Sequence, residues 1–419
     1  MKLLEKIEKT KDCWFLIVII FIFFLLRLPS LFEPLWYGDE GIYQVIGMAI
    51  NQDRLLYQDI WDNKPPLLYI LYGFFSSDQF TIRLVSLFFG IFATISFWAL
   101  ARKLFQKKEL AVFFSTGFFA LLFAIPLLEG NIANAENFML FPILLAGLLI
   151  YTIQTENYTL HAKSYALAVA GFLLSLAFLF KIVAIFDFAA FTLFLVYVIK
   201  NKQEQLLFFF SAFVLPLLAV ALFFFSKGAF TPFLDATLQQ NVSYVGYGNR
   251  FLIPQGLLLT KLFLLFLSSA FLFIKRQKLS SAALFIFLWL IFALFNAFFS
   301  ARPYAHYLLV LLPSLSLVVG LLFVKERKQM YKKALALFLF VIVFFTGTNF
   351  NLYLKIIPYY TNFISFVTNN KSVFAYQGFF DKQTPIDYAI ASYLNMRMKE
   401  KDAVFIWGNN GQVYAMINK

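Results

Sequence analysis

The sequence has few charged residues, a single cysteine and no sign of a cleavable leader. Charged side chains make up 14% of the 419 residues and hydrophobic ones 61%, whereas an ordinary soluble domain is roughly 25% charged. This composition excludes a soluble globular protein. Cys13 has no second cysteine to pair with, which excludes an intrachain disulfide and any cysteine-based metal site. No small-residue cleavage site follows the first apolar run, at 13–31, so we expect an uncleaved membrane span there.

The basic residues gather in short clusters between apolar runs. A net charge of +13 would suit a nucleic-acid partner, but clusters alternating with spans are typical of loops on one side of a membrane. The clusters lie at 2–11, 102–108, 163, 200–202, 275–278 and 325–333. The alternate loops carry few basic residues: Arg54, Lys64, Lys181, Lys227, Arg250 and Arg302. The positive-inside rule then predicts a cytoplasmic amino terminus, with membrane lipids rather than nucleic acid as surroundings.

Eleven apolar runs approach the length of about 20 residues needed to cross a bilayer. They are 13–32, 82–101, 110–128, 137–153, 165–180, 182–199, 206–226, 256–274, 281–299, 306–324 and 334–352. We predict an all-α polytopic membrane domain over 1–352, with an extracytoplasmic carboxyl terminus. The stretch 165–199 is interpreted as two helices that turn outside near Lys181, because a single helix would exceed ~50 Å. Lys181 and Asp187 could pair with each other there.

Two longer segments are expected on the outer side. The first, 33–80, is polar at its start but apolar over 67–75, which is typical of short helices lying along the membrane surface. Pro65 and Pro66 suit the first turn of such a helix. The second, 227–255, contains three glycines and polar residues, and is expected to form a mobile loop over the cavity.

After the last span the composition becomes that of an extracytoplasmic segment, 353–419. The pattern predicts a helix over 387–398, a short strand over 402–407, a glycine turn at 408–411 and another helix, which is the start of a small α/β domain. One strand cannot form a stable sheet alone. We therefore expect either that the chain is truncated or that this tail packs on the outer loops.

The first outer loop concentrates residues that could carry chemistry. Asp39 and Glu40 follow the first span, and Lys64 stands directly before Pro65 and Pro66. Taken singly, each has a plain structural interpretation: the acids could be solvated or cap a helix, and the lysine could extend to the membrane interface. Farther along the chain, Glu136 could cap a helix as readily as serve a site, although an acid near the membrane is a functional candidate.

Together these residues resemble a known group of enzymes. The pattern consists of Asp39-Glu40, Tyr43, Tyr57-x-Asp59, Asn63-Lys64-Pro65-Pro66-Leu67, Glu136 and Arg302-Pro303-Tyr304-Ala305-His306-Tyr307. It is similar to the glycosyltransferases that include the protein O-mannosyltransferases and the bacterial aminoarabinose lipid A transferases, which share the GT-C fold. The similarity extends over nearly the whole chain, and its most specific part is Asp39-Glu40 combined with Lys64-Pro65-Pro66.

The resemblance implies an inverting transfer of a sugar from a polyprenyl phosphate to a cell-envelope acceptor outside the cytoplasmic membrane. Asp39 would be the catalytic base. The phosphate leaving group would need cations or other donors: Lys64, Arg302, His306, Tyr304 and Tyr307. Supporting or substrate-binding roles would fall to Glu40, Tyr43, Tyr57, Asp59, Asp62 and Glu136. No spacing demands a metal ion, so we predict a metal-independent reaction without a cofactor.

The sequence differs from this group at two points, and these differences leave the substrate unassigned. Ile42 stands where the aminoarabinose transferases usually have an arginine, and the 227–255 loop is too short for the large insertion of the eukaryotic protein mannosyltransferases. The sugar and the acceptor, whether lipid, polymer or protein, are therefore not assigned. The alternative is a flippase or transporter of polyprenyl-linked sugars. That alternative predicts charges at mid-membrane and internal repeats, and no repeat is evident.

Overall fold

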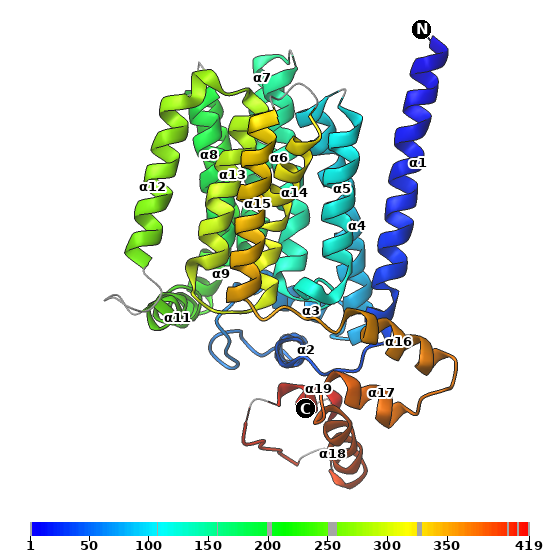
Figure 1. Cartoon of the computed structure of the whole chain (residues 1–419). Coiled ribbons are helices and arrows are strands. Elements are labelled where there is room, and N and C mark those ends of the chain that lie inside the picture. Colours follow the sequence, from blue (N-terminus) through cyan, green and yellow to red (C-terminus); the bar gives the residue numbers. More distant parts are fainter. Residues whose placement is uncertain are drawn as a thin grey trace.

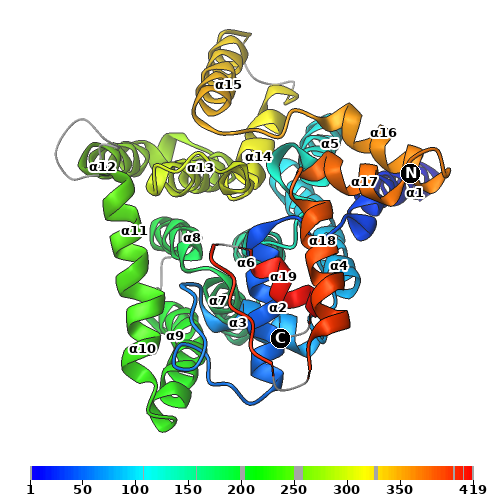
Figure 2. The same cartoon turned by 90° about the horizontal axis from the view of Figure 1, so that it is seen from below.

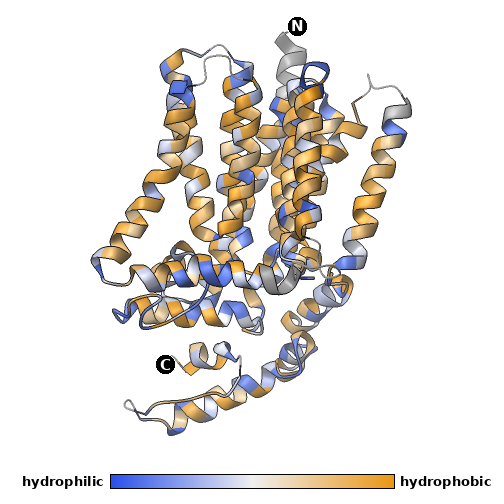
Figure 3. Cartoon of the chain, turned by 90° about the vertical axis from the view of Figure 1, so that its left-hand side faces the viewer, coloured by the Kyte–Doolittle hydropathy of each residue, from blue (hydrophilic) through white to orange (hydrophobic). Residues whose placement is uncertain are grey.

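The structure is a computed structural model that describes every residue except 1, 107, 157, 199–202, 250–257, 325–328, 400–401, 409 and 418–419. A bundle of long apolar helices forms one layer, and short helices lie across one end of it (Figure 1). The hydropathy colouring separates these two layers, because the bundle is hydrophobic along most of its length and the short helices are mixed (Figure 3). Within the described residues the chain forms helices and no β-strand.

The helices account for all eleven predicted spans. Eight of those described are long and apolar enough to cross a membrane, and three are apolar but shorter. The bundle helices are α1 (Lys2–Arg27), α4 (Gln79–Phe105), α5 (Glu109–Ala124), α6 (Ala135–Thr155), α7 (Leu160–Phe180), α8 (Ile185–Val198), α9 (Gln203–Ser226), α12 (Leu258–Lys275), α13 (Ser281–Phe299), α14 (Leu312–Leu322) and α15 (Gln329–Asn349). The chain is therefore a multi-pass membrane protein.

The two termini lie at opposite ends of the bundle (Figure 1). The described basic loops, such as the one containing Arg276 and Lys278, lie at the amino-terminal end of the bundle, as the charge pattern predicted. The clusters at 200–202 and 325–328 are outside the described residues. We refer to the opposite end, which carries the short helices, as the outer end. The assignment of the two ends to the two sides of the cytoplasmic membrane stays a prediction.

The apolar stretch 165–199 forms two helices, as predicted. α7 ends at Phe180, Lys181 is extended, and a 3-10 turn at Ile182–Ala184 leads into α8. The suggested pairing of Lys181 with Asp187 is wrong. Asp187 points into the bundle and accepts a hydrogen bond from Trp289 Nε1 at 2.7 Å, whereas Lys181 lies at the helix break and turns toward Glu136.

Two other expectations are corrected. Residues 230–249 of the supposed mobile loop form α10 (Phe230–Leu234), a π-helical turn (Asp235–Gln239) and α11 (Gln240–Asn249). Their apolar residues hold them to the bundle, since the Phe233 ring stacks on Phe224 with 4.8 Å between centroids. The span predicted to begin at 306 begins at Leu312, because Pro313 occupies the first turn of α14. Residues 305–309 form a separate 3-10 turn at the outer end.

The outer layer contains the predicted surface helices. They are α2 (Gly38–Asn51), α3 (Pro66–Phe74), α16 (Ile356–Val367), α17 (Val373–Phe380), α18 (Thr384–Arg397) and α19 (Gly411–Ile417). Seen from below, α19 lies over α2 (Figure 2). A β-carbon on Gly41 would be 2.5 Å from the backbone nitrogen of Gln412, so only glycine permits this contact. The tail therefore packs on the first outer loop, which is one of the two expected outcomes.

The strand predicted over 402–407 is not formed. The segment is extended, and the described residues offer it no neighbouring strand, so its β-forming sequence has nothing to pair with. Phe405 and Trp407 are strongly exposed as a result.

A buried ion network fixes α2 to the bundle. Arg83, in the outer part of α4, is fully buried; its Nε donates to Glu40 Oε1 at 3.1 Å and its Nη1 lies 3.2 Å from Glu33 Oε2. The backbone nitrogen of Ala133 also donates to Glu40 Oε1, at 2.8 Å, and the Tyr359 hydroxyl donates to Glu33 Oε1. Because these partners satisfy one another, the network can join the first outer loop, α4, the loop before α6 and α16 in an apolar setting.

We expect Arg83→Ala to destabilise the protein by roughly 3–5 kcal/mol, because two buried carboxylates lose their common cation. Thermal unfolding of purified protein in detergent measures this loss. The matched control is Arg102→Ala, which breaks a partly exposed pair with Asp12 at 3.1 Å and should cost no more than about 1 kcal/mol. Equal shifts in the two variants would contradict a structural role for the buried network.

Candidate active site

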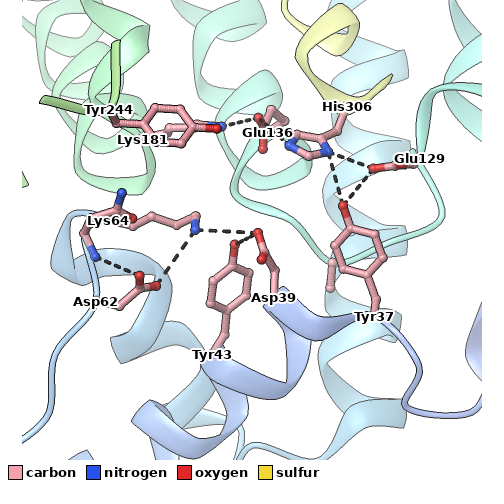
Figure 4. A network of polar contacts seen from close by, with 12 residues as sticks. Tyr37, Asp39, Tyr43, Asp62, Lys64, Glu129, Glu136, Lys181, Tyr244 and His306 are labelled. Atoms are coloured by element: carbon pink, nitrogen blue, oxygen red, sulfur yellow. Dashed lines mark hydrogen bonds and ion pairs between the residues drawn. The ribbon is translucent and has the colours of Figure 1, made fainter. Parts of the chain in front are cut away.

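Asp39 and Lys64 meet at the outer end of the bundle. Lys64 Nζ lies 3.6 Å from Asp39 Oδ2, and the Tyr43 hydroxyl donates to the same oxygen at 2.9 Å. The ammonium also lies over the Tyr43 ring, 4.8 Å from its centroid. The side chain of Asp39 is 43% exposed and that of Lys64 is 18% exposed. A carboxylate and an ammonium are therefore presented together to a space that a substrate can enter (Figure 4).

The loop before α3 holds Lys64 in place. Asp62 Oδ2 lies 3.9 Å from Lys64 Nζ and accepts a hydrogen bond from the Tyr69 hydroxyl at 2.6 Å. The Tyr57 hydroxyl donates to the backbone carbonyl of Lys64 at 2.7 Å. Asn241, on α11, donates to the Asn63 carbonyl at 2.6 Å and so joins this loop to the helix above it. The ammonium is thus positioned by packing and hydrogen bonds on both sides of the loop.

A second polar cluster faces the first one (Figure 4). Lys181, at the break between α7 and α8, forms an ion pair with Glu136 in the first turn of α6. His306 connects this pair to the next acid, since its Nε2 lies 3.8 Å from Glu136 Oε1 and its Nδ1 lies 2.7 Å from Glu129 Oε2. The Tyr37 hydroxyl donates to Glu129 Oε2 at 2.8 Å. Tyr37 is the residue before α2, so the cluster reaches back to the helix that carries Asp39.

Asp39 is held in its charged form. Burial by itself raises the pKa of Asp39, but the Lys64 charge, the Tyr43 hydroxyl and the more distant charges of His306 and Lys181 together lower the pKa below its ordinary value of 3.8. Burial followed by the neighbouring Asp39 charge raises the pKa of Tyr43 well above 10.0, so this phenol stays a donor. At neutral pH the site therefore presents an ionised carboxylate.

An apolar cavity of about 360 Å³ opens beside the second cluster. Its polar wall includes Glu136, Lys181, Tyr244 and Tyr307, and its apolar wall comes from the start of α8, from α11 and from the outer end of α13. Lys181 Nζ lies 4.4 Å from the centroid of the Tyr307 ring, and the hydroxyls of Tyr244 and Tyr307 are 3.3 Å apart. The cavity thus combines an apolar interior with a cation and two phenols at its edge, which suits an amphipathic ligand.

The structure brings together many of the predicted site residues. Asp39, Tyr43, Tyr57, Asp62 and Lys64 belong to the first cluster, and Glu136, His306 and Tyr307 to the second. Both ring nitrogens of His306 face carboxylates, so it links Glu129 to Glu136 instead of pointing at a phosphate site. Tyr304 stacks on the His306 ring, 5.7 Å between centroids, and is 46% exposed.

Three predicted residues lie apart from the clusters. Glu40 is 1% exposed and supports α2 through Arg83. Asp59 is exposed and accepts a hydrogen bond from the Leu55 nitrogen at 2.7 Å, which closes its own turn. Arg302 lies over the Tyr244 ring, 4.7 Å from the centroid, and that ring lines the cavity.

Sequence reasoning missed Tyr37, Glu129, Tyr244 and Arg83 and gave Lys181 the wrong partner. Two of these residues could have been found, because Arg83 lies inside an apolar run and Lys181 lies between two apolar runs. Charged residues at such positions usually have a structural or functional role. Glu129 has a left-handed backbone, with φ of 56°, an unusual conformation for a glutamate. Its carboxylate contacts Tyr37 and His306, and no sequence pattern predicts this position.

Within the part of the chain that the structure describes, no three His, Cys, Asp or Glu side chains converge to hold a metal ion. Independence from metal stays a prediction, because a substrate could bring further ligands.

Comparison with known proteins identifies the fold. No protein-family model matches the chain, and no curated protein sequence does. Among solved structures, the chain is similar to ArnT from Cupriavidus metallidurans bound to undecaprenyl phosphate, with a TM-score of 0.58 and 13% identity over 96% of this chain and 84% of that one. It also matches the Archaeoglobus fulgidus oligosaccharyltransferase AglB in complex with an inhibitory peptide and a dolichol-phosphate, with a TM-score of 0.46 and 13% identity over 98% of this chain and 64% of that one. The ArnT match confirms the predicted all-α polytopic GT-C fold.

The pKa of Asp39 gives a prediction about stability and pH. A carboxylate whose pKa is lower in the folded than in the unfolded protein stabilises the fold above the unfolded pKa, and that contribution is lost as pH falls through the folded pKa. Lys64→Met removes the Lys64 charge, which is the largest of the effects that lower the pKa of Asp39, and leaves burial, which raises it. We therefore expect the variant to be less stable than the wild type at neutral pH and to lose less stability as the pH falls below 3.8, so that the two melting temperatures converge in acid.

Melting curves recorded from neutral pH to below 3.8 test this expectation. Lys227→Met is the control, because Lys227 is an exposed lysine just after α9. Its curve should follow the wild type. If Lys64→Met follows the wild type as well, the charge of Lys64 does not set the ionisation of Asp39.

Proposed function

We propose that the protein is an inverting glycosyltransferase that moves a sugar from a polyprenyl-phosphate-linked donor to a cell-envelope acceptor at the outer face of the cytoplasmic membrane. The observation that carries the proposal is the pairing of an ionised carboxylate, Asp39, with the Lys64 ammonium 3.6 Å away at the outer end of a GT-C bundle. One group can take a proton and the other can stabilise a departing phosphate, which are the two needs of this reaction.

Asp39 is the proposed general base. The two contacts that the described residues make with its carboxylate both go to Oδ2, which leaves Oδ1 for the proton of an acceptor hydroxyl. As that proton moves to Asp39, the acceptor oxygen forms a bond to the anomeric carbon of the donor from the side opposite the phosphate. The bond between the anomeric carbon and the phosphate oxygen breaks, and its electron pair leaves with the polyprenyl phosphate. Attack from the opposite side inverts the anomeric configuration.

Lys64 is the proposed partner of the donor phosphate, with Lys181 and Tyr307 on the facing side. An ammonium has three N–H donors, so Lys64 can bind a phosphate oxygen while it stays near Asp39 and Asp62. The prenyl chain would enter the 360 Å³ cavity, whose edge carries Lys181 and Tyr307. The undecaprenyl phosphate bound to ArnT supports a ligand of this class. The charged groups lie at the outer end of the spans instead of halfway along them, so we do not extend the proposal to a transporter.

The proposal predicts different losses in two variants. Asp39→Asn should keep donor binding and lower turnover by roughly 10²–10⁴-fold, the usual contribution of a positioned base. Lys64→Ala should lose both donor binding and turnover, because it removes the phosphate contact. The assay is transfer of radiolabelled sugar from purified polyprenyl-phosphate sugars in proteoliposomes that contain envelope lipids, with donor binding measured separately.

Asp59→Asn is the matched control, since it makes the same chemical change at an exposed acid of the same loop. Its transfer rate should stay close to that of the wild type. Wild-type transfer by Asp39→Asn would remove Asp39 from the reaction.

A further inference from the structure

A group of polar side chains lies beside Asp39, on the side away from Lys64. Figure 4 shows Asp39 between the Lys64 ammonium and the pair formed by Glu129 and Tyr37. Burial, followed by the charges of Glu129 and Asp39, raises the pKa of Tyr37 well above 10.0, so this phenol stays a donor and feels both acids. The Asn134 amide acts on the same phenol. We refer to Tyr37, Glu129 and Asn134 as the Glu129 group.

The Glu129 carboxylate has one oxygen available for a ligand. Its Oε2 accepts a hydrogen bond from the Tyr37 hydroxyl at 2.8 Å and lies 2.7 Å from His306 Nδ1. The contacts that the described residues make with this carboxylate go to Oε2 alone, and the side chain is 21% exposed. An ionised carboxylate only accepts hydrogen bonds. Oε1 is therefore suited to a ligand that donates, such as a hydroxyl, and its charge repels a phosphate.

Asn134 adds a second open acceptor. It is the residue before α6 and is 1% exposed, but its side chain does not cap the helix. Its Oδ1 is buried and accepts no hydrogen bond from any residue that the structure describes. A buried acceptor without a donor is costly, and a ligand hydroxyl can satisfy it either directly or through a bound water. The two open atoms of the Glu129 group thus have the same requirement.

The direction of the proposed reaction puts the acceptor on this side. With the donor phosphate at Lys64, inversion requires the acceptor oxygen to approach the anomeric carbon from the opposite side. Asp39, which takes the proton, lies between Lys64 and the Glu129 group, so an acceptor approaching in this way meets that group. The Tyr304 ring, which stacks on His306 and is 46% exposed, adds a flat apolar surface beside it. Hydrogen-bond acceptors next to an exposed aromatic ring suit a sugar, which has donating hydroxyls and an apolar ring face.

We propose that the Glu129 group is the acceptor subsite, and that the acceptor is an uncharged sugar unit of an envelope glycan. The proposal rests on the function proposed above, because that function places the donor phosphate at Lys64. Glu129 Oε1 and Asn134 Oδ1 accept hydrogen bonds from the sugar hydroxyls, and the Tyr304 ring packs on the apolar face of the sugar. The reacting hydroxyl gives its proton to Asp39. This narrows the acceptor from lipid, polymer or protein to a carbohydrate.

Binding of a simple sugar tests the subsite without turnover. The probe is methyl β-glucoside, with its 6-phosphate as the charged counterpart, titrated by saturation-transfer difference NMR against the protein in nanodiscs. The wild type should bind the glucoside more tightly than the phosphate. Glu129→Gly removes the carboxylate and suits the left-handed backbone there, φ 56°, so the variant should fold. We expect it to weaken glucoside binding roughly tenfold, the effect of one hydrogen bond to a charged group, and to leave binding of undecaprenyl phosphate unchanged.

Glu109→Gly is the matched control. It makes the same chemical change at an exposed acid in the first turn of α5, at the other end of the bundle from the site. Its binding of both probes should equal that of the wild type.

Competition with the donor separates the two sugar positions. Asp39→Asn, which should bind the donor without turning it over, is saturated with undecaprenyl-phosphate glucose, and the glucoside titration is repeated. Glucoside binding should persist, because the two sugars lie on opposite sides of the bond that forms. Displacement by the donor would assign the Glu129 group to the donor sugar and overturn the acceptor proposal.

Three other results would also overturn it: no binding of the glucoside to the wild type, tighter binding of the 6-phosphate, or unchanged glucoside binding by Glu129→Gly. The proposed function fails in a different way. If no polyprenyl-phosphate sugar is transferred in proteoliposomes while glucoside binding still depends on Glu129, the acceptor role falls with the proposed function and the sugar site stands.

Discussion

The buried cation of Arg83 is the constraint on which the site depends. Asp39 and Glu40 are neighbours on α2, and successive residues of a helix point about 100° apart, so the two acids must face different surroundings. Glu40 is drawn inward by Arg83 and is almost completely buried, while Asp39 is left at the surface that faces Lys64. The ion network therefore does more than attach α2 to the bundle. It sets the rotation of the helix and with it the direction of the carboxylate.

This arrangement gives the Asp-Glu pair two distinct functions that residue type alone would not separate. The buried member needs full compensation, and it receives Arg83 and the Ala133 nitrogen. The exposed member, Asp39, is only partly compensated, by Lys64 and Tyr43. These two groups lower the pKa of Asp39 and leave its carboxylate accessible to a substrate. Gly41, the next residue, allows α19 to lie against the outer side of the same helix. Three consecutive residues therefore have different roles: Asp39 presents its carboxylate to the site, Glu40 attaches α2 to the bundle, and Gly41 allows the tail to pack against the helix.

The fold could be predicted from the sequence because a membrane imposes strong local rules. Span length and the distribution of lysine and arginine are read along the chain, and each predicted span corresponds to a helix. The first cluster was also within reach, since Asp39 and Lys64 lie in one loop. The second cluster was predicted only in part, since Glu136, His306 and Tyr307 were named from the resemblance. Glu129 and Lys181 were missed because they come from separate parts of the chain and meet the others only in the folded bundle. The mistaken strand at 402–407 has the same origin: pairing in a sheet depends on a neighbour that local pattern cannot supply.

The position of Tyr244 connects the site to the membrane around it. Its ring lines the 360 Å³ cavity, its hydroxyl lies 3.3 Å from that of Tyr307, and its face carries the Arg302 guanidinium. Because Asn241, one helical turn earlier, holds the Lys64 loop, a shift of α11 would change the lysine position and the wall of this cavity together. A ligand in this cavity therefore acts on the same helix that holds the Lys64 loop.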